Sequence, residues 1–262
     1  MFNPQSHSQP SHWQVVAASV TGKSHEKQDL PCQDAYAFRS LPNDNLIVAV
    51  ADGAGSAKFS DLGARLAVET SVETLTQTLT QRTAADLETI WKDQLTQALQ
   101  AAQTSVEQAA QNQNAELRDL ATTLSITLIT PEAAMVAQIG DGAVVVATPA
   151  DEVQALTVPD RGEHLNETTF LVCENALETA QFAQWLGRPS HLAAFSDGLQ
   201  LLALKLPQGI PHKPFFSPLF QFASQASDLR VAQEQLVDFL RSPRVTERTD
   251  DDLTLVLAAL KL

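Results

Sequence analysis

Basic residues are scarce in this sequence. Its 262 residues include 17 lysines and arginines against 31 aspartates and glutamates, so the formal net charge is −14 at pH 7. Nucleic acids and anionic membrane surfaces attract proteins through basic surfaces. The charge balance therefore argues against both as main partners, and a solubilising acidic surface accounts for most of the negative charge.

Cysteine is also rare. The only two cysteines are Cys32 and Cys173, and neither lies in a CxxC motif or a Cys/His cluster. A structural zinc site is therefore not expected. We expect reduced thiols in a cytoplasmic protein, although the sequence leaves a single disulfide open.

Long apolar runs are missing as well. No run reaches the roughly 18 residues that a transmembrane helix needs. The first twelve residues, MFNPQSHSQPSH, are polar and lack the apolar segment of a secretory signal. We expect residues 1–12 to be a disordered lead and residues 13–262 to form a single domain, present as a cytoplasmic monomer.

Several catalytic and ligand-binding motifs do not occur. The sequence has no GxSxG elbow, no CxxxxxR loop and no phosphate-binding P-loop. It also lacks the D-x-D-x-D-G-x₅-E calcium loop. Nucleophilic catalysis by a serine or cysteine is therefore not indicated, and neither is an EF-hand calcium protein.

The patterns that are present indicate an α+β domain. Hydrophobic residues make up 44% of the chain, which is enough to fill a core. Helical spacing predicts helices over about 61–80, 87–106 and 229–240, the second opened by a Thr83/Asp86 capping box. A further helix is expected from Gly198. Strands are predicted over 14–20, 34–39, 45–51, 121–130, 132–140, 142–148, 152–158, 191–197 and 253–260.

Short turns at Pro131, Gly140–Gly142 and Pro149 join consecutive strands, and we interpret them as hairpin turns. Hairpins favour antiparallel sheets over a Rossmann fold. The segment 206–218 is rich in proline and is interpreted as a loop. Its PHKPFFSP part could dock a partner, but an apolar loop fixed to the core is the preferred interpretation.

Acidic residues recur at the ends of the predicted strands. These sites are Gln33-Asp34, Asp52-Gly53, Asp141, Asp197-Gly198 and Asp251-Asp252. Carboxylates gathered in one place repel one another unless they bind a cation. Ligand sets made of oxygen favour Mg²⁺, Mn²⁺ or Ca²⁺ over Zn²⁺.

The motifs PCQDA, VAVADGAGSAKFSDLGA, ATTLSITLI, AQIGDG, FSDGL and DDLTLVL occur in this order between residues 14 and 260. Together they resemble the metal-dependent Ser/Thr protein phosphatases of the PPM, or protein phosphatase 2C, type and are most similar to a compact bacterial branch. The resemblance implies a four-layer α-β-β-α sandwich of two antiparallel sheets flanked by helices. It also implies a metal site at one edge of the sandwich.

The resemblance further implies roles for particular residues. Asp52 would bridge two Mg²⁺ or Mn²⁺ ions, and Gly53 would offer its carbonyl to one of them. Asp197 and Asp251 would complete the other ion's ligands and, with Asp52, carry catalysis. Gln33 would touch a metal through water, with Asp34 behind it. The family pattern also allows a third ion, held by Asp141 together with Asp197.

The activity implied is hydrolysis of phosphoserine and phosphothreonine in proteins by a metal-bridging water. Two ions lower the pKa of such a water and neutralise the phosphoryl charge. The partners would be phosphoprotein substrates and an opposing Ser/Thr kinase. The alternative is a non-catalytic or weakly active regulatory or binding module that keeps the fold.

The chain departs from the family pattern at several positions, and the missing arginine and histidine favour that alternative slightly. Asp29 stands where an arginine often grips the substrate phosphate, so we expect Asp29 to face solvent and Lys23, His25 or Lys27 to replace the arginine. Ala54 stands in place of a histidine, and His25 is a candidate to replace it as acid. Gly142-Ala143 replaces the usual Ser-Arg pair, and the flap at 159–170 is short. Cys32, close to Asp34, could confer redox sensitivity, although a buried inert thiol is the preferred interpretation.

Overall fold

The computed structural model describes residues 12–79, 84–157, 159 and 168–261. Residues 1–11 of the expected N-terminal lead, the Thr83/Asp86 capping contact and most of the flap lie outside what is described there. The last residue of that lead, His12, is instead the first residue of strand β1 (His12–Val20). Within the described ranges, no helix combines the length and the apolarity needed to cross a bilayer.

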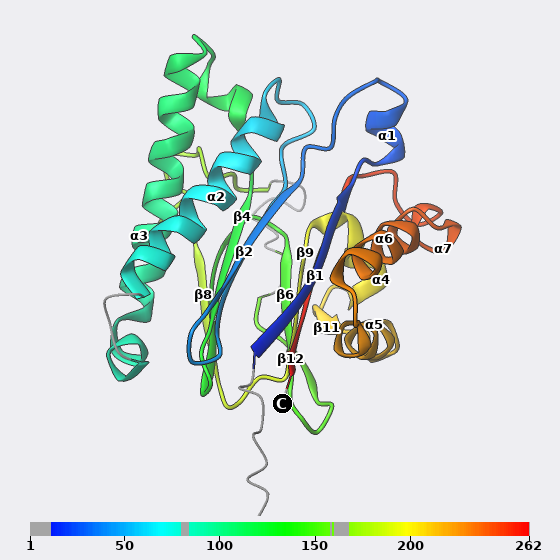
Figure 1. Cartoon of the computed structure of the whole chain (residues 1–262). Coiled ribbons are helices and arrows are strands. Elements are labelled where there is room, and N and C mark those ends of the chain that lie inside the picture. Colours follow the sequence, from blue (N-terminus) through cyan, green and yellow to red (C-terminus); the bar gives the residue numbers. More distant parts are fainter. Residues whose placement is uncertain (1–11, 80–83, 158, 160–167, 262) are drawn as a thin grey trace, which may run out of the picture.

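Two five-stranded antiparallel sheets form the centre of the fold (Figure 1). The first has the order β1 (His12–Val20), β12 (Leu253–Lys261), β9 (His191–Phe195), β6 (Ala143–Ala147) and β7 (Val153–Ala155). The second has the order β2 (Ala35–Leu41), β3 (Asn45–Ala51), β4 (Leu124–Ile129), β5 (Ala133–Ile139) and β8 (Gln181–Leu186). A short separate pair joins β10 (Leu204–Lys205) and β11 (Ile210–Pro211).

Helices cover the outer faces of both sheets, as Figure 1 shows. The long helices α2 (Ser60–Leu79) and α3 (Ala84–Asn112) pack on the sheet that contains β3 and β4. The other sheet is covered by α5 (Lys213–Gln225), α6 (Leu229–Leu240) and α7 (Pro243–Thr246). Shorter segments are α1 (Lys23–Glu26), η1 (Leu117–Leu120), η2 (Asp197–Leu199) and α4 (Gln200–Ala203). The predicted four-layer α-β-β-α sandwich is thus confirmed.

The apolar sequence of the central strands explains this layering. Along β3, Ile47 packs with the helices while its neighbour Val48 packs between the sheets. Alternate side chains of a strand point to opposite faces, so a strand covered on both sides must be apolar throughout. Every residue of β4, β5 and β6 is buried accordingly.

The turn at Gly140–Gly142 is not a hairpin, which corrects the sequence-based interpretation. It joins β5 of one sheet to β6 of the other. Gly140 has φ +101, and a Cβ there would lie 2.5 Å from the Thr123 side chain. Glycine therefore permits a tight crossing that brings Asp141 to the edge between the sheets.

The proline-rich segment is also not simply a loop. Helix α5 begins at Lys213 with Pro214 in its first turn, where a missing N–H costs nothing. Phe216, Leu219 and Phe220 form its buried face against the core. The aromatic PHKPFFSP stretch is therefore the start of a core-packed helix, and the prolines hid its helical periodicity.

Core packing between the helices and the sheet should dominate stability. Leu99 of α3 is fully buried, and Gln100 beside it is exposed. Leu99→Ala should lower the free energy of unfolding by about 2–5 kcal/mol, measured by urea denaturation. Gln100→Ala should change it by less than about 0.5 kcal/mol, and equal losses in the two variants would contradict this packing.

Candidate active site

Loops from both sheets meet at one edge of the sandwich and carry the acidic residues. Asp52 follows β3, Asp141 lies between β5 and β6, and Asp197 follows β9. Asp251 and Asp252 precede β12, and Gln33-Asp34 precede β2. Strand ends from two separate sheets therefore bring together residues that are far apart in the sequence.

Backbone and threonine contacts fix the position of Asp52. Its carbonyl accepts hydrogen bonds from Thr123 N at 2.8 Å and from Thr122 Oγ1 at 2.9 Å. Its own N–H donates to Thr123 Oγ1 at 3.0 Å. These contacts to the residues just before β4 hold the Asp52 main chain rigidly while its side chain stays half-buried.

The carboxyl groups of Asp52, Asp197 and Asp34 interact strongly. Burial raises the pKa of Asp52 well above its usual range, and the charges of Asp34 and Asp197 raise it further. Burial raises the pKa of Asp197 to about 6, although a hydrogen bond with Asp52 opposes the shift. The two carboxyl groups therefore lie close enough to share a proton.

Asp34 is affected by the charges of Asp252 and Asp197, and its carboxylate accepts hydrogen bonds from Ser196 and Thr254. Burial raises its pKa to about 8, although hydrogen bonds from Ser196 and Thr254 lower it. Ser196 Oγ donates to Asp34 Oδ2 at 2.6 Å, and Thr254 N donates to Ser196 Oγ at 3.0 Å. Asp34 is thus connected through Ser196 to β9, which leads to Asp197, and to β12, which follows Asp251.

Gln33 and Gly53 are in direct contact. Gly53 N donates to Gln33 O at 3.1 Å, and a Cβ on Gly53 would lie only 2.6 Å from that oxygen. The close approach requires glycine at position 53. The Gln33 side chain is 6% exposed, and its Oε1 has no hydrogen-bond partner.

A buried glutamine holds the turn that carries Asp141. Gln138 Nε2 donates to Gly140 O at 3.1 Å and to Gly142 O at 2.8 Å, while its Oε1 accepts from Thr157 Oγ1 at 2.7 Å. Asp141 Oδ2 accepts from Thr168 Oγ1 at 2.8 Å. The charge of Asp141 also contributes to the raised pKa of Asp197, so the two carboxylates are neighbours.

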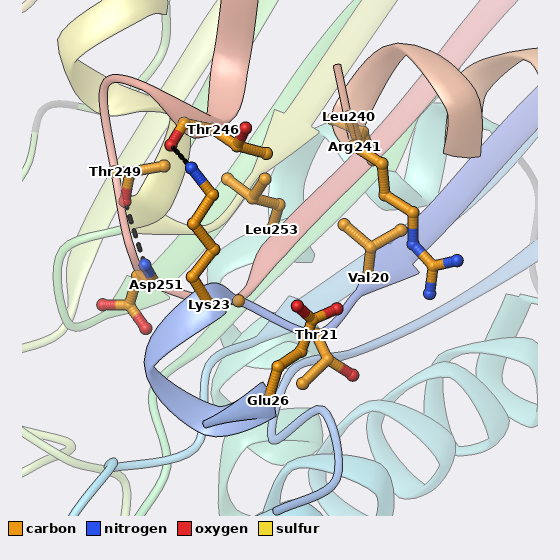
Figure 2. Close-up of a pocket in the computed structure, with 11 residues that line it drawn as sticks. Val20, Thr21, Lys23, Glu26, Leu240, Arg241, Thr246, Thr249, Asp251 and Leu253 are labelled. Atoms are coloured by element: carbon orange, nitrogen blue, oxygen red, sulfur yellow. Dashed lines mark hydrogen bonds between the residues drawn. The ribbon is translucent and has the colours of Figure 1, made fainter. Parts of the chain in front are cut away.

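Asp251 is the exposed member of the group. Its Oδ1 accepts from Asp252 N at 2.8 Å, and it lines a cavity of about 150 Å³ together with Lys23, Glu26 and Arg241. Figure 2 shows Lys23 in this cavity, directed at Thr246, whose carbonyl oxygen accepts a hydrogen bond from Lys23 Nζ.

The three residues expected to replace the missing arginine lie in different settings. Lys23 lies beside Asp251 but is hydrogen-bonded to Thr246 O. His25 is buried, with Nδ1 3.0 Å from Asp252 Oδ1, a contact that is poorly aligned as a hydrogen bond and becomes an ion pair when the imidazole is protonated. Lys27 is exposed.

Asp29 faces solvent, which confirms the expectation for this position. It has φ 54, and its N–H donates to Glu26 O. Aspartate tolerates this left-handed conformation better than most residues, and Asp29 lies in the turn that follows α1.

Cys32 has the character of an inert thiol. Burial raises its pKa, and the carboxylates of Asp34 and Asp252 raise it further. A thiol that stays protonated is a poor nucleophile. Both Cys32 and Cys173 are free, so the two do not form a disulfide.

The oxygen atoms at this edge fit a hard cation. Among the described residues, three buried oxygens near the acidic group lack hydrogen-bond partners: Gln33 Oε1, Asp34 Oδ1 and Asp197 Oδ1. In the same ranges, no three His, Cys, Asp or Glu side chains lie close enough together to bind one metal ion as they stand. The donors here are carboxylates, an amide and a backbone carbonyl, which is the chemistry that Mg²⁺ and Mn²⁺ prefer.

Sequence reasoning assigned no role to three residues that hold this site, although it named Asp252 as one of the acidic residues at strand ends. Gln138, Ser196 and Asp252 are buried, and each accepts or donates at least two hydrogen bonds or close polar contacts. The only sequence signal was their placement: a polar residue at the end of an apolar strand or next to a motif aspartate.

Comparisons with known proteins agree with one another. The family model described as Protein phosphatase 2C matches residues 21–241. Serine/threonine-protein phosphatase 3 of Escherichia coli K12 is 37% identical over 252 residues, covering 94% of this chain and 98% of that protein.

Solved structures share the fold at low sequence identity. The serine/threonine phosphatase of S. agalactiae has a TM-score of 0.64 at 16% identity and covers 95% of this chain and 100% of its own. The catalytic domain of the phosphatase PstP in complex with two manganese ions has a TM-score of 0.61 at 16% identity and covers 96% and 99% of the two chains. The family model spans most of the chain and the E. coli relative aligns nearly end to end, so the chain belongs to the protein phosphatase 2C family.

Proposed function

We propose that the acidic edge of the sandwich is the active site of a metal-dependent protein serine/threonine phosphatase. Family membership and the near full-length similarity to an E. coli serine/threonine-protein phosphatase support this activity for the chain as a whole. The observation that carries the site assignment is that the carboxyl groups of Asp52 and Asp197 lie within hydrogen-bonding reach of each other, and that one buried Asp197 oxygen has no hydrogen-bond partner.

The residues proposed to hold the ions are Asp52, the Gly53 carbonyl, Asp197, Asp251 and Gln33, with Asp34 behind them. When bound, Mg²⁺ or Mn²⁺ activates water for attack on phosphorus and offsets the charge of the phosphoryl group. Asp197 can hold or release a proton close to neutral pH, because burial, and then the charges of Asp141 and Asp251, raise its pKa to about 6. Burial and the charges of Asp34 and Asp197 also raise the pKa of Asp52. No protein nucleophile is required for this chemistry.

The substrate is a phosphoprotein, and we propose an opposing Ser/Thr kinase as its source. Lys23 and Lys27 are the better candidates for contacting the phosphate, because His25 is directed at Asp252. Lys23 is the better placed of the two lysines, since it lines the same cavity as Asp251, whereas Lys27 is exposed. The non-catalytic alternative is not favoured, because the complete set of acidic motif residues is present.

The central carboxylate can be tested directly. Asp52→Asn removes the charge that would bridge two ions, so Mn²⁺-dependent hydrolysis of p-nitrophenyl phosphate and of phosphopeptides should fall to background while the circular dichroism spectrum stays unchanged. The exposed Asp238 provides a matched control. Asp238→Asn should keep wild-type turnover, and near-wild-type activity in Asp52→Asn would refute the assignment.

The raised pKa values predict how the stability of the metal-free protein depends on pH. In the folded state Asp197 titrates at about 6 and Asp34 at about 8, against 3.8 as the ordinary value for both. The folded state therefore binds more protons than the unfolded state in this window, and the free energy of unfolding falls as pH rises through it.

In EDTA, the melting temperature should therefore decrease from about pH 4 to about pH 8, and Asp34→Asn should make that decrease shallower. Asp238→Asn should leave the slope unchanged. Parallel melting curves for wild type and Asp34→Asn would show that Asp34 does not carry the shifted pKa.

A third ion at Asp141 is the least supported part of the site. We propose that Asp141 and Asp197 hold it more weakly than the two core ions are held. Asp141→Ala should then remove the weakest class of Mn²⁺ sites in calorimetric titration and reduce turnover, while the tighter sites persist. Loss of all Mn²⁺ binding in this variant would contradict the separate assignment.

A further inference from the structure

We propose that Asp252 is a positioning residue for the metal site. Its buried carboxylate holds the loop that carries Gln33 against the segment just before β12, which carries Asp251. Asp251 is the aspartate assigned to the ions, whereas both carboxylate oxygens of Asp252 contact Gly22, His25 and Gln33. The inference rests on the proposed function of the acidic edge.

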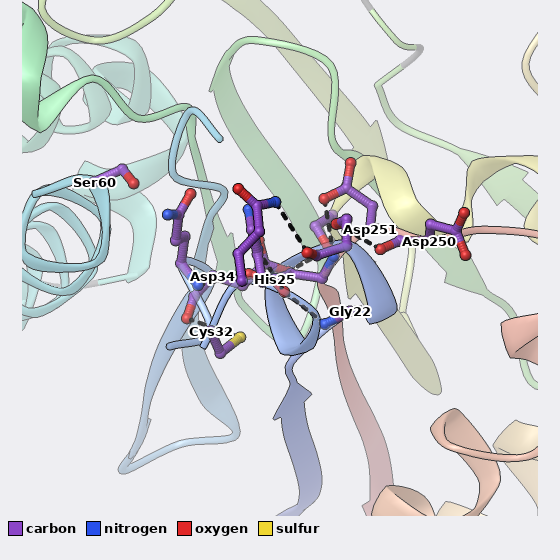
Figure 3. A network of polar contacts seen from close by, with 12 residues as sticks. Gly22, His25, Cys32, Asp34, Ser60, Asp250 and Asp251 are labelled. Carbon is purple, nitrogen blue, oxygen red and sulfur yellow. Dashed lines mark hydrogen bonds and ion pairs between the residues drawn. The ribbon is translucent and has the colours of Figure 1, made fainter. Parts of the chain in front are cut away.

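Both oxygens of Asp252 are used by the loop between β1 and β2. The Asp252 side chain is 2% exposed. Its Oδ1 accepts from Gly22 N at 2.6 Å and lies 3.0 Å from His25 Nδ1, and its Oδ2 accepts from Gln33 N at 2.6 Å. Figure 3 shows Gly22 and His25 in the loop that passes next to Asp251.

The contact with Gln33 continues to the next proposed ligand. Gln33 donates its N–H to Asp252, and its carbonyl oxygen accepts from Gly53 N at 3.1 Å. A continuous line of hydrogen bonds thus runs from Asp252 through the Gln33 main chain to the residue after Asp52. A displacement of the Asp252 carboxylate would shift Gln33 and Gly53 together.

The main chain around Asp252 is packed tightly against the main chain at Gly22 and Gly198. A Cβ on Gly22 would lie 2.2 Å from the Asp251 carbonyl carbon, and a Cβ on Gly198 would lie 2.3 Å from the Asp252 carbonyl oxygen. The loop, the turn after Asp197 and the start of β12 are therefore in direct main-chain contact. Groups that orient metal ligands from behind in this way affect metal affinity as well as stability.

A carboxylate is the side chain that this arrangement requires. It offers two acceptor oxygens, and hydrogen bonds to a charged acceptor are stronger than neutral ones. An asparagine of the same shape has one oxygen and one NH₂ group, which cannot accept. In Asp252→Asn one of the two main-chain donors must therefore face another donor, and either Gly22 or Gln33 must move.

The experiment measures Mn²⁺ binding by calorimetry, together with the rise in melting temperature that Mn²⁺ causes. Asp252→Asn should weaken Mn²⁺ affinity roughly 10–100-fold and reduce the Mn²⁺-induced rise accordingly. Asp250→Asn is the matched control, because Asp250 is an exposed neighbour whose substitution makes the same change in charge. Its Mn²⁺ affinity should equal that of wild type.

A purely structural effect of Asp252 is separated by Leu99→Ala, which should lose stability yet keep wild-type Mn²⁺ affinity. If Asp252→Asn does not fold, His25→Ala tests the proposal instead. This variant removes one of the groups that contact the Asp252 carboxylate, and it should weaken Mn²⁺ binding by a smaller factor. Wild-type Mn²⁺ affinity in the deciding variant would overturn the positioning role. Failure of the wild-type protein to bind Mn²⁺ would instead refute the proposed function.

Discussion

Repulsion between closely spaced, partly buried carboxylates governs the arrangement of the acidic edge. Burial raises the pKa of Asp52, Asp34 and Asp197, and the negative charges of neighbouring aspartates raise each of them further. Such a group weakens the folded state at neutral pH unless a proton or a cation compensates. Folding of such a protein brings the carboxylates together at a cost in stability, and a cation that binds between them would relieve their repulsion.

Core packing in the sandwich compensates for the unfavourable repulsion among the acidic residues. The central strands are apolar on both faces, so two sheets and two helical layers bury a large core. The acidic residues stand only where strands end, next to main chain that hydroxyl and carboxylate groups hold in place. Thr123 fixes Asp52, Ser196 fixes Asp34, and Gln138 fixes the turn of Asp141.

Much of the fold could be predicted from local patterns. Strands β3, β4 and β12 could be predicted because each is a continuous apolar run that is buried on both sides. Helix α6 could be predicted from the helical spacing of its one buried face. Helix α5 was not readable, because Pro214 and Pro218 obscure its periodicity. The sheet membership of β5 and β6 was also hidden, since a Gly-Asp-Gly turn is equally compatible with a hairpin and with a crossing between sheets.

The amino-acid sequence is enough to predict which residues would carry the chemistry, because the acidic motifs at strand ends form a recognisable ordered set. How these residues are held in place became visible only in the folded structure. Asp252 meets Gly22 and Gln33 across 230 and 219 positions of sequence, and Ser196 meets Asp34 across 162. Hydrogen bonds between such distant residues depend on how the two sheets pack face to face and which strand ends this packing brings together. A local sequence pattern does not specify contacts between residues so far apart in the chain.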